Sequence, residues 1–423
     1  MDYQQSLDYL YGLQRFGIKL GLENVRALLE RLGHPEAGFA IVHVGGSNGK
    51  GSVSACLAEI LCQGGHRVGL YTSPHLHSFT ERIRVDGVPI SEPEIARLTE
   101  DLRARSEGIP ATFFEFATAL ALQYFFEQKV DFVVLEVGMG GRLDATNAVT
   151  PVLAILTPIC FDHGEHLGPD LAAIAAEKGG IIKPGVPVVI GPQDPVALHV
   201  LLGQAKERRA PVLLYDRDYQ VESSPGGFSF NAAGLQLQDV VPGLPGVHQH
   251  SNFATALAAA QELRRQGVSL DEAALRKGVR QVRWPGRLEW WQGERSVLLD
   301  GAHNAGGARV LADYLDTVPA DAVRWVVGVK GDKRFEDILA PLLPRVTALY
   351  CTTPPVDGAV PPDDLAACGV AAGLPVRIFD QAGNALAAAL ADCREGEIVL
   401  VAGSLFLVAA AREYLMGQEG ARW

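Results

Sequence analysis

The sequence predicts an α/β protein in which a doubly wound, mostly parallel sheet forms the larger, N-terminal domain. Short apolar segments rich in Val and Ile alternate with segments of helical periodicity, and a glycine-rich turn follows the first of them. Near-continuous apolar strands joined by helices are typical of parallel sheets covered on both faces. The 423 residues suffice for two or three domains, and 48% hydrophobic with 20% charged residues fits a folded globular chain.

The apolar segments of the first half are spaced so that a helix fits between most of them. The predicted strands are residues 39–44, 67–71, 131–137, 152–158 and 186–191. Helices are expected over residues 52–62 and 114–128, where apolar residues recur at helical spacing. Residues 212–245 differ, because short alternating runs lie between turn residues and indicate a small antiparallel appendage. A further helix is expected over residues 252–266.

The alternation of apolar strands and helices restarts after a WPGR segment. The predicted strands of this part are residues 296–300, 324–329, 347–353, 376–380 and 397–403. The same reasoning gives a second, smaller, Rossmann-like α/β domain. We therefore predict two domains, residues 1–282 and 283–423.

Composition argues against several classes of function. The 37 Lys and Arg residues against 49 Asp and Glu residues give a net charge of −12, which disfavours nucleic acid or an anionic membrane as partner. The six cysteines include no CxxC pair, as expected for reduced thiols. Residues 1–14 do not resemble a signal peptide, and the most apolar stretch, 398–411, is too short to span a membrane. We expect a cytoplasmic protein.

The segment VGGSNGKGS, residues 44–52, predicts a phosphate-binding loop between a strand and a helix. Glycines let backbone N–H groups turn toward an anion, and the helix N-terminus adds partial positive charge. Lys50 would reach the terminal phosphates, and the Ser52 hydroxyl could lie near Mg²⁺. The loop departs from the usual pattern at Val44 and Gly51. The alternative is a strand-to-helix turn that binds nothing.

Three further polar residues follow later strands of the predicted sheet. Glu136 ends a buried strand, His163 follows the next one, and Lys178 lies late in a predicted helix. In open α/β sheets, ligands bind outside the carboxyl ends of the strands, so these residues are candidates for metal or nucleotide binding. Taken singly, each also suits a structural role: a salt bridge for the acid, packing for the imidazole, solvation for the lysine.

Nine short motifs follow one another along the chain. They are GSNGKGS (46–52), TSPHL (72–76), ERI (81–83), TFFEF (112–116), LEVGMGGRLDATN (135–147), DH (162–163), EKGGIIK (177–183), WPGRLE (284–289) and DGAHN (300–304). In this combination the chain resembles the folylpolyglutamate synthases, including the bifunctional dihydrofolate synthase form, of the Mur ligase superfamily. Ser47 and Gly179 stand where that family more often has Thr and Ala.

This resemblance implies an ATP-dependent amide ligase that requires Mg²⁺, with two ions in the site. ATP would phosphorylate a carboxylate of a folate or of dihydropteroate, and the amine of L-glutamate would attack the acyl phosphate. Carboxylates are poor electrophiles, and phosphoryl transfer between anions needs cations to offset the charge. The small-molecule substrates would be the only partners, and a monomer is expected.

The resemblance also assigns residues of this chain to roles. Contacts with ATP fall to Ser47, Asn48, Gly49, Lys50, Gly51, Ser52, Asn252, Arg287 and Asp300. Mg²⁺ ligands are Ser73, Glu136, His163 and Lys178, the lysine as a carbamate. The pterin side is lined by Thr112, Phe113, Phe114, Glu115, Leu143, Asp144 and Ala145. Catalytic roles fall to Lys50, Lys178, Arg287 and His303.

Some of these residues also have structural interpretations. DGAHN also suits a strand-to-helix turn with its Asp as a helix cap, and a phenylalanine at residues 113–114 also suits the core. Two other functions stay open: another Mur-type amino-acid ligase, although residues 1–44 leave little room for a uridine-nucleotide domain, and a non-catalytic nucleotide-binding switch. Because the candidate residues fall on both predicted domains, we expect the domains to close over the substrates.

Overall fold

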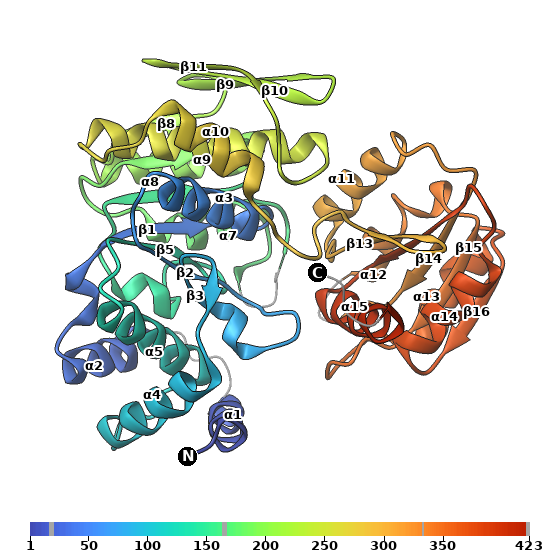
Figure 1. Ribbon diagram of the computed structural model, residues 1–423, viewed down its shortest axis with the longest axis horizontal. Coiled ribbons are helices and arrows are strands. Elements are labelled where there is room, and N and C mark those ends of the chain that lie inside the picture. Colours follow the sequence, from blue (N-terminus) through green and yellow to red (C-terminus); the bar gives the residue numbers. More distant parts are fainter. Residues whose placement is uncertain (17–20, 163–166, 332–333, 420–423) are drawn as a thin grey trace. The chain divides into compact units, whose positions relative to one another are not determined.

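Two sheets organise the computed structural model, which describes residues 1–16, 21–162, 167–331 and 334–419 (Figure 1). The chain forms two compact units. The first unit holds most of the described residues up to Arg283. The second unit holds those from Trp284 onward together with Leu244–His248 and the described residues Phe161 and Asp162.

The first unit is built on an eight-stranded sheet with the order β4-β3-β2-β5-β1-β6-β7-β8. Its strands are β1 (Ala40–Gly45), β2 (Val68–Tyr71), β3 (Ile83–Val85), β4 (Val88–Pro89), β5 (Phe132–Glu136), β6 (Leu153–Leu156), β7 (Val188–Ile190) and β8 (Val212–Leu214). The six strands β2, β5, β1, β6, β7 and β8 run parallel, and β3 and β4 add an antiparallel edge beside β2. The predicted doubly wound, mostly parallel sheet is confirmed.

Helices cover both faces of this sheet, as the apolar character of its strands requires. They are α1 (Tyr3–Gly12), α2 (Glu23–Leu32), α3 (Lys50–Gln63), α4 (Glu92–Arg105), α5 (Phe113–Glu127), α7 (Leu171–Lys178), α8 (Pro195–Glu207), α9 (Val247–Arg265) and α10 (Glu272–Gln281). Figure 1 shows α3 and α10 on one side of the sheet and α5 on the other. Ile41, Val133 and Leu135 pack into the core under α1, α2, α4 and α5.

The antiparallel appendage begins later in the chain than expected. Residues 212–214 form β8, which pairs parallel with β7, so the antiparallel appendage begins later than residue 212. The appendage is a three-stranded sheet of β9 (Tyr219–Ser224), β10 (Gly227–Ala232) and β11 (Leu235–Val240). The apolar run VLL extends the edge of the main sheet, whereas the residues after it alternate.

The second unit contains a six-stranded sheet with the order β12-β13-β17-β14-β15-β16. Its strands are β12 (Glu289–Gln292), β13 (Ser296–Asp300), β14 (Val323–Val327), β15 (Ala348–Thr352), β16 (Val376–Phe379) and β17 (Ile398–Ala402). β12 is antiparallel and the others are parallel. The helices are α11 (Ala305–Leu315), α12 (Phe335–Leu339), α13 (Pro362–Ala371), α14 (Ala382–Asp392) and α15 (Leu405–Glu419). The five predicted strands are found, and β12 is additional.

Short 3₁₀-helices connect several of these elements. They are η1 (Leu13–Phe16), η2 (Pro35–Gly38), η3 (Phe79–Arg82), η4 (Ala145–Ala148), η5 (Gly179–Ile181) and η6 (Leu343–Arg345). Within the described part of the chain, every helix is too short or too polar to span a lipid bilayer.

Candidate active site

The loop between β1 and α3 has a backbone that requires glycine at two positions. Gly46 and Gly49 have φ angles of +138° and +83°, in the region that side chains disfavour. A Cβ atom at Gly46 would lie 2.0 Å from the Thr157 hydroxyl oxygen, and one at Gly49 would lie 2.5 Å from Asn252 Oδ1. The loop therefore packs tightly against β6 and α9, and the predicted ATP contact Asn252 lies beside it.

The N-terminus of α3 offers donors for an anion. Gly49 is the N-cap residue, and no side chain among the described residues caps the helix. The first intrahelical bond runs from Val53 N–H to Gly49 O at 2.9 Å. The N–H groups of Lys50, Gly51 and Ser52 thus have no acceptor within the helix, and together with the helix dipole they suit a phosphate.

The two candidate lysines meet at one carbonyl oxygen of this loop. Lys50 Nζ donates to Gly46 O and Ser47 O, each at 3.2 Å. Lys178, at the end of α7, is buried, and its Nζ donates to Gly46 O at 3.0 Å. Although 128 positions separate them in the sequence (178 minus 50), the fold brings both amines to the phosphate loop.

Ser47 and Asn48 fasten the loop to the chain after β6. The Ser47 hydroxyl donates to Cys160 O at 3.0 Å and accepts from Cys160 N–H at 3.1 Å. The N–H groups of Ser47 and Asn48 both donate to Pro158 O, at 3.0 and 3.1 Å. A threonine at position 47 would supply the same hydroxyl, so the serine keeps this anchor.

Glu136 lies at the carboxyl end of β5, where strand register places it beside Val44 of β1. Its side chain is buried, and Oε2 accepts a hydrogen bond from Ser73 N–H at 3.3 Å. The structure therefore brings together two of the predicted metal ligands, and His163 lies outside the described residues. Carboxylate and hydroxyl oxygens are the ligands that Mg²⁺ prefers, so the donor set fits this ion.

The residues predicted on the pterin side include a helix cap. Glu115 Oε2 accepts from Thr112 N–H at 2.7 Å and from the Thr112 hydroxyl at 2.9 Å, which fixes the first turn of α5. Phe113 and Phe114 are half-buried. The Phe113 ring stacks on Tyr11 with centroids 5.6 Å apart, and Phe114 lies against Gly138.

The ERI motif contains Arg82, for which the sequence predicts no role. Arg82 is buried, its guanidinium lies 5.4 Å from the centre of the Phe113 ring, and its Nε donates to His75 Nδ1 at 2.8 Å. Burial lowers the pKa of Arg82. Burial and the neighbouring Arg82 lower the pKa of His75 to about 4, so the imidazole is neutral near pH 7. A cation in this position suits an anionic group of a bound substrate.

Asp144 is turned into its own loop. Its carboxylate accepts from Met139 N–H at 2.8 Å, from Thr146 N–H at 3.0 Å and from the Thr146 hydroxyl. Burial raises the pKa of Asp144, and these hydrogen bonds oppose that shift. Ala145 is buried at the start of η4, and Leu143 is half-buried. We infer that Asp144 shapes the predicted pterin side from within the loop.

In the second unit, Asp300 holds the turn after β13. Its carboxylate accepts from Leu288 N–H at 2.9 Å and from Ala302 N–H at 2.8 Å. Burial raises the pKa of Asp300, and Arg287 is the largest opposing influence. A Cβ atom at Gly301 would lie 2.1 Å from Arg287 Nη1, so the Arg287 guanidinium packs directly against this glycine. Asp300 and Arg287 are therefore neighbours in the second unit.

The helix cap in DGAHN is Asn304 and not the aspartate. Asn304 Oδ1 accepts from Gly307 N–H at 2.9 Å at the start of α11, and its Nδ2 donates to Asp162 Oδ2 at 3.2 Å. His303 Nδ1 donates to Gly301 O at 2.8 Å, and its Nε2 lies 3.9 Å from the same Asp162 oxygen. Asp162 thus joins the cluster, which the sequence did not predict.

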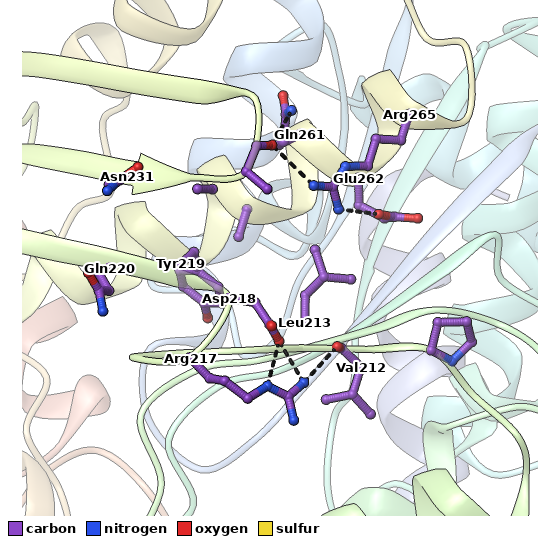
Figure 2. A pocket seen from close by; sticks show the side chains of 14 residues that line it. Val212, Leu213, Arg217, Asp218, Tyr219, Gln220, Asn231, Gln261, Glu262 and Arg265 are labelled. Atoms are coloured by element: carbon purple, nitrogen blue, oxygen red, sulfur yellow. Dashed lines mark hydrogen bonds and ion pairs between the residues drawn. The ribbon is translucent and has the colours of Figure 1, made fainter.

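A pocket of about 550 Å³ lies between the appendage and α9 (Figure 2). Arg217 and Asp218 are paired there at 2.6 Å, and Arg265 lies 3.5 Å from Glu262. Arg265 also donates to Ala233 O at 3.1 Å. The charged side chains that line this pocket thus pair with one another, and none of the predicted site residues lines the pocket.

Comparison with known proteins identifies the family. The Mur ligase middle domain matches residues 44–260, and the Mur ligase glutamate ligase domain matches residues 286–405. The dihydrofolate synthase/folylpolyglutamate synthase of Bacillus subtilis is 38% identical over 351 residues, which cover 80% of this chain and 82% of that protein. The chain belongs to the folylpolyglutamate synthase family of Mur ligases. The resemblance seen in the sequence is confirmed, and with it the expected ATP-dependent ligase class.

Solved structures of this folylpolyglutamate synthase family have the same fold. Escherichia coli FolC in complex with DHPP and ADP superposes with a TM-score of 0.92 at 33% identity, covering 99% of this chain and 98% of that chain. The bifunctional enzyme of Yersinia pestis with AMPPNP and a Mn ion superposes with a TM-score of 0.90 at 34% identity, covering 100% and 98%. Both were solved with nucleotide bound, and one with a divalent cation.

Proposed function

We propose that the protein adds L-glutamate to the carboxylate of a folate in an ATP-dependent reaction that passes through an acyl phosphate. Dihydropteroate is the second acceptor to be tested. The observation that carries this proposal is the phosphate loop itself. Three helix N–H groups lie beside Lys50, Lys178 reaches Gly46 O of the same loop, and strand register places Glu136 beside Val44 at its start. The proposed substrates are supported by the relatives: the Bacillus subtilis protein is named a dihydrofolate synthase/folylpolyglutamate synthase, and Escherichia coli FolC was solved with DHPP and ADP.

The chain's own residues have separable tasks in this reaction. The N–H groups of residues 50–52 and the Lys50 ammonium bind the phosphates and offset their charge during transfer. Mg²⁺, when bound, screens the anions that react; Ser73, Glu136, His163 and carbamylated Lys178 would hold it. Phe113 and Phe114, which are half-buried, are assigned to contacts with the flat pterin ring. In the second unit, Arg287 and Asp300 are assigned to ATP, and His303 to the glutamate side.

The division into residues 1–282 and 283–423 is part of this proposal. It is supported by the two matched family domains, which fall on either side of residue 283. We also propose a monomer, to be measured by light scattering, and a cytoplasmic location.

Release of ADP tests the function. We expect it only when ATP, tetrahydrofolate and L-glutamate are all present, with a product one glutamyl residue heavier. Replacing tetrahydrofolate with dihydropteroate in a paired assay determines the second activity. Nucleotide binding without glutamate-dependent ADP release would favour a switch, and absence of turnover on every pteroate and folate would exclude the proposal.

The carbamate at Lys178 makes a separate prediction. Carbamylation converts the positively charged Lys178 ammonium into a negatively charged carboxylate. A carboxylate can bind the cation that Glu136 would hold, whereas an ammonium would repel it. Lys178→Ala should therefore be nearly inactive and should recover part of its activity when small carboxylates such as acetate are added. Lys183 is the control, because it is a neighbouring lysine whose Nζ donates to Asn147 O at 2.9 Å. If acetate restores Lys183→Ala equally, or restores neither variant, the carbamate is wrong.

A further inference from the structure

A buried histidine lies under the phosphate loop, and none of the roles above includes it. His43 is in β1, three residues before Gly46, and its side chain is fully buried. Its Nε2 lies 2.9 Å from the Thr146 hydroxyl oxygen in η4, 103 residues further along the chain. Thr146 in turn contacts Asp144. These three side chains form a line of hydrogen bonds, which we call the His43 relay.

The direction of each bond in the His43 relay follows from the donors available. Asp144 accepts a backbone N–H bond at each of its two oxygens, from Met139 at Oδ2 and from Thr146 at Oδ1, so both oxygens act as acceptors and the Thr146 hydroxyl donates to Oδ1. A hydroxyl has one hydrogen, so Thr146 Oγ1 has only an acceptor to offer His43. The imidazole therefore carries its hydrogen on Nε2.

Two observations agree with this tautomer. His43 Nδ1 is buried and has no hydrogen-bond partner among the described residues, which is tolerable for a bare nitrogen but costly for an N–H group. Burial, and secondarily the charge of Lys183, lower the pKa of His43 to about 3. The ring is therefore neutral at physiological pH and acts as a fixed donor.

The His43 relay ends on the turn that follows Glu136. Asp144 Oδ2 accepts from Met139 N–H at 2.8 Å, which ties residues 138–141 to β1 through Thr146 and His43. We call residues 138–141 the GMGG turn.

The GMGG turn touches both a predicted substrate residue and a predicted metal residue. A Cβ atom at Gly138 would lie 2.3 Å from Cζ of Phe114, and one at Gly141 would lie 2.7 Å from the backbone oxygen of Lys178. These contacts have no slack, so a shift of the turn by a few tenths of an ångström would displace the Phe114 ring and the end of α7 together.

We propose that His43 is a positioning residue, which through Thr146 and Asp144 fixes the GMGG turn and thereby sets the affinities for the pteridine substrate and for Mg²⁺. The inference rests on the proposed function, which assigns Phe114 and Lys178 to those ligands. Groups that orient metal ligands from outside typically change affinity or activity by about 10- to 100-fold.

The kinetic test compares variants that break the His43 relay with variants that keep it. Thr146→Val and His43→Leu remove a hydroxyl and a donor, whereas Thr146→Ser and His43→Gln retain them. We expect the first pair to raise the KM for tetrahydrofolate and the half-saturating Mg²⁺ concentration about tenfold, with the KM for L-glutamate unchanged. The second pair should stay close to wild type.

Thr99→Val is the matched control, because Thr99 is a buried threonine whose hydroxyl has no partner in the described structure. It should leave every constant unchanged. A merely structural role for the His43 relay predicts less folded enzyme, which lowers kcat and moves no KM. That result would overturn the inference.

A second readout needs neither metal nor turnover. Nitrogen NMR of the metal-free wild-type protein should show His43 neutral and protonated on Nε2 throughout about pH 5 to 8, the range in which an ordinary histidine titrates. A hydrogen on Nδ1, or titration in that range, would overturn the inference. If the wild-type enzyme turns over and Thr146→Val matches Thr99→Val, the inference alone fails. If the wild-type enzyme has no glutamate-dependent turnover, the proposed function fails and the inference with it.

Discussion

Replacing Lys50 with alanine is expected to lower kcat by about 10³-fold, because the change removes the cation that faces the phosphoryl group during transfer. The lost contacts with Gly46 O and Ser47 O are hydrogen bonds of 3.2 Å from a half-buried side chain, so the fold should persist. The measurement is glutamate-dependent ADP release at saturating ATP, tetrahydrofolate and L-glutamate.

Lys277→Ala serves as the control, since Lys277 is an exposed lysine on α10 and its loss should not affect the rate. Circular dichroism would establish that both variants fold. A rate for Lys50→Ala near that of Lys277→Ala at saturating ATP would mean that Lys50 has no part in phosphoryl transfer.

Replacing Glu136 with glutamine should raise the half-saturating Mg²⁺ concentration and lower kcat, each by about 10- to 100-fold. Glutamine keeps an oxygen that can accept from Ser73 N–H, the 3.3 Å bond that Glu136 makes, but it lacks the charge that binds a hard cation. The measurement is the Mg²⁺ dependence of ADP release at fixed ATP.

For this variant the control is Glu207→Gln, an exposed glutamate at the end of α8. Its Mg²⁺ dependence should equal that of the wild-type enzyme. If Glu136→Gln also matched the wild type, the metal would have to be held without this carboxylate.

The parallel sheets could be predicted because each buried strand is a short apolar run bounded by helical segments. β12 could not, since Glu289, Trp290 and Trp291 are only half-buried and lack the apolar run of the other strands. Similarly, α9 begins at Val247, whereas the sequence predicts a start at residue 252. The earlier start could not be predicted because the first turn is polar, although Gln249 and His250 are buried in the structure. Tertiary packing, which a local pattern does not contain, determines both.

The same distinction separates the site residues. The phosphate loop could be predicted because its glycines and Lys50 are adjacent in the sequence. Arg82, Asp162 and His43 acquire their significance from distant partners: Asp162 meets Asn304 over 142 positions, and His43 meets Thr146 over 103. Arg82 and Asp162 lie in the short ERI and DH motifs, but no local pattern shows what they contact, and His43 lies in none of the motifs.

The last strand of the second sheet has a consequence for how the protein is made. β17 lies between β13 and β14 and is buried along its whole length, so it is central to the sheet although, among the described residues, it is the last strand in sequence order. A nascent chain therefore carries β13, from residue 296, without its central neighbour until residue 402 has left the ribosome. Folding of this unit is thus a late event in synthesis, governed by contacts between residues far apart in the chain. During that interval the edges of β13 and β14 that β17 later covers are unpaired, and unpaired strand edges favour aggregation.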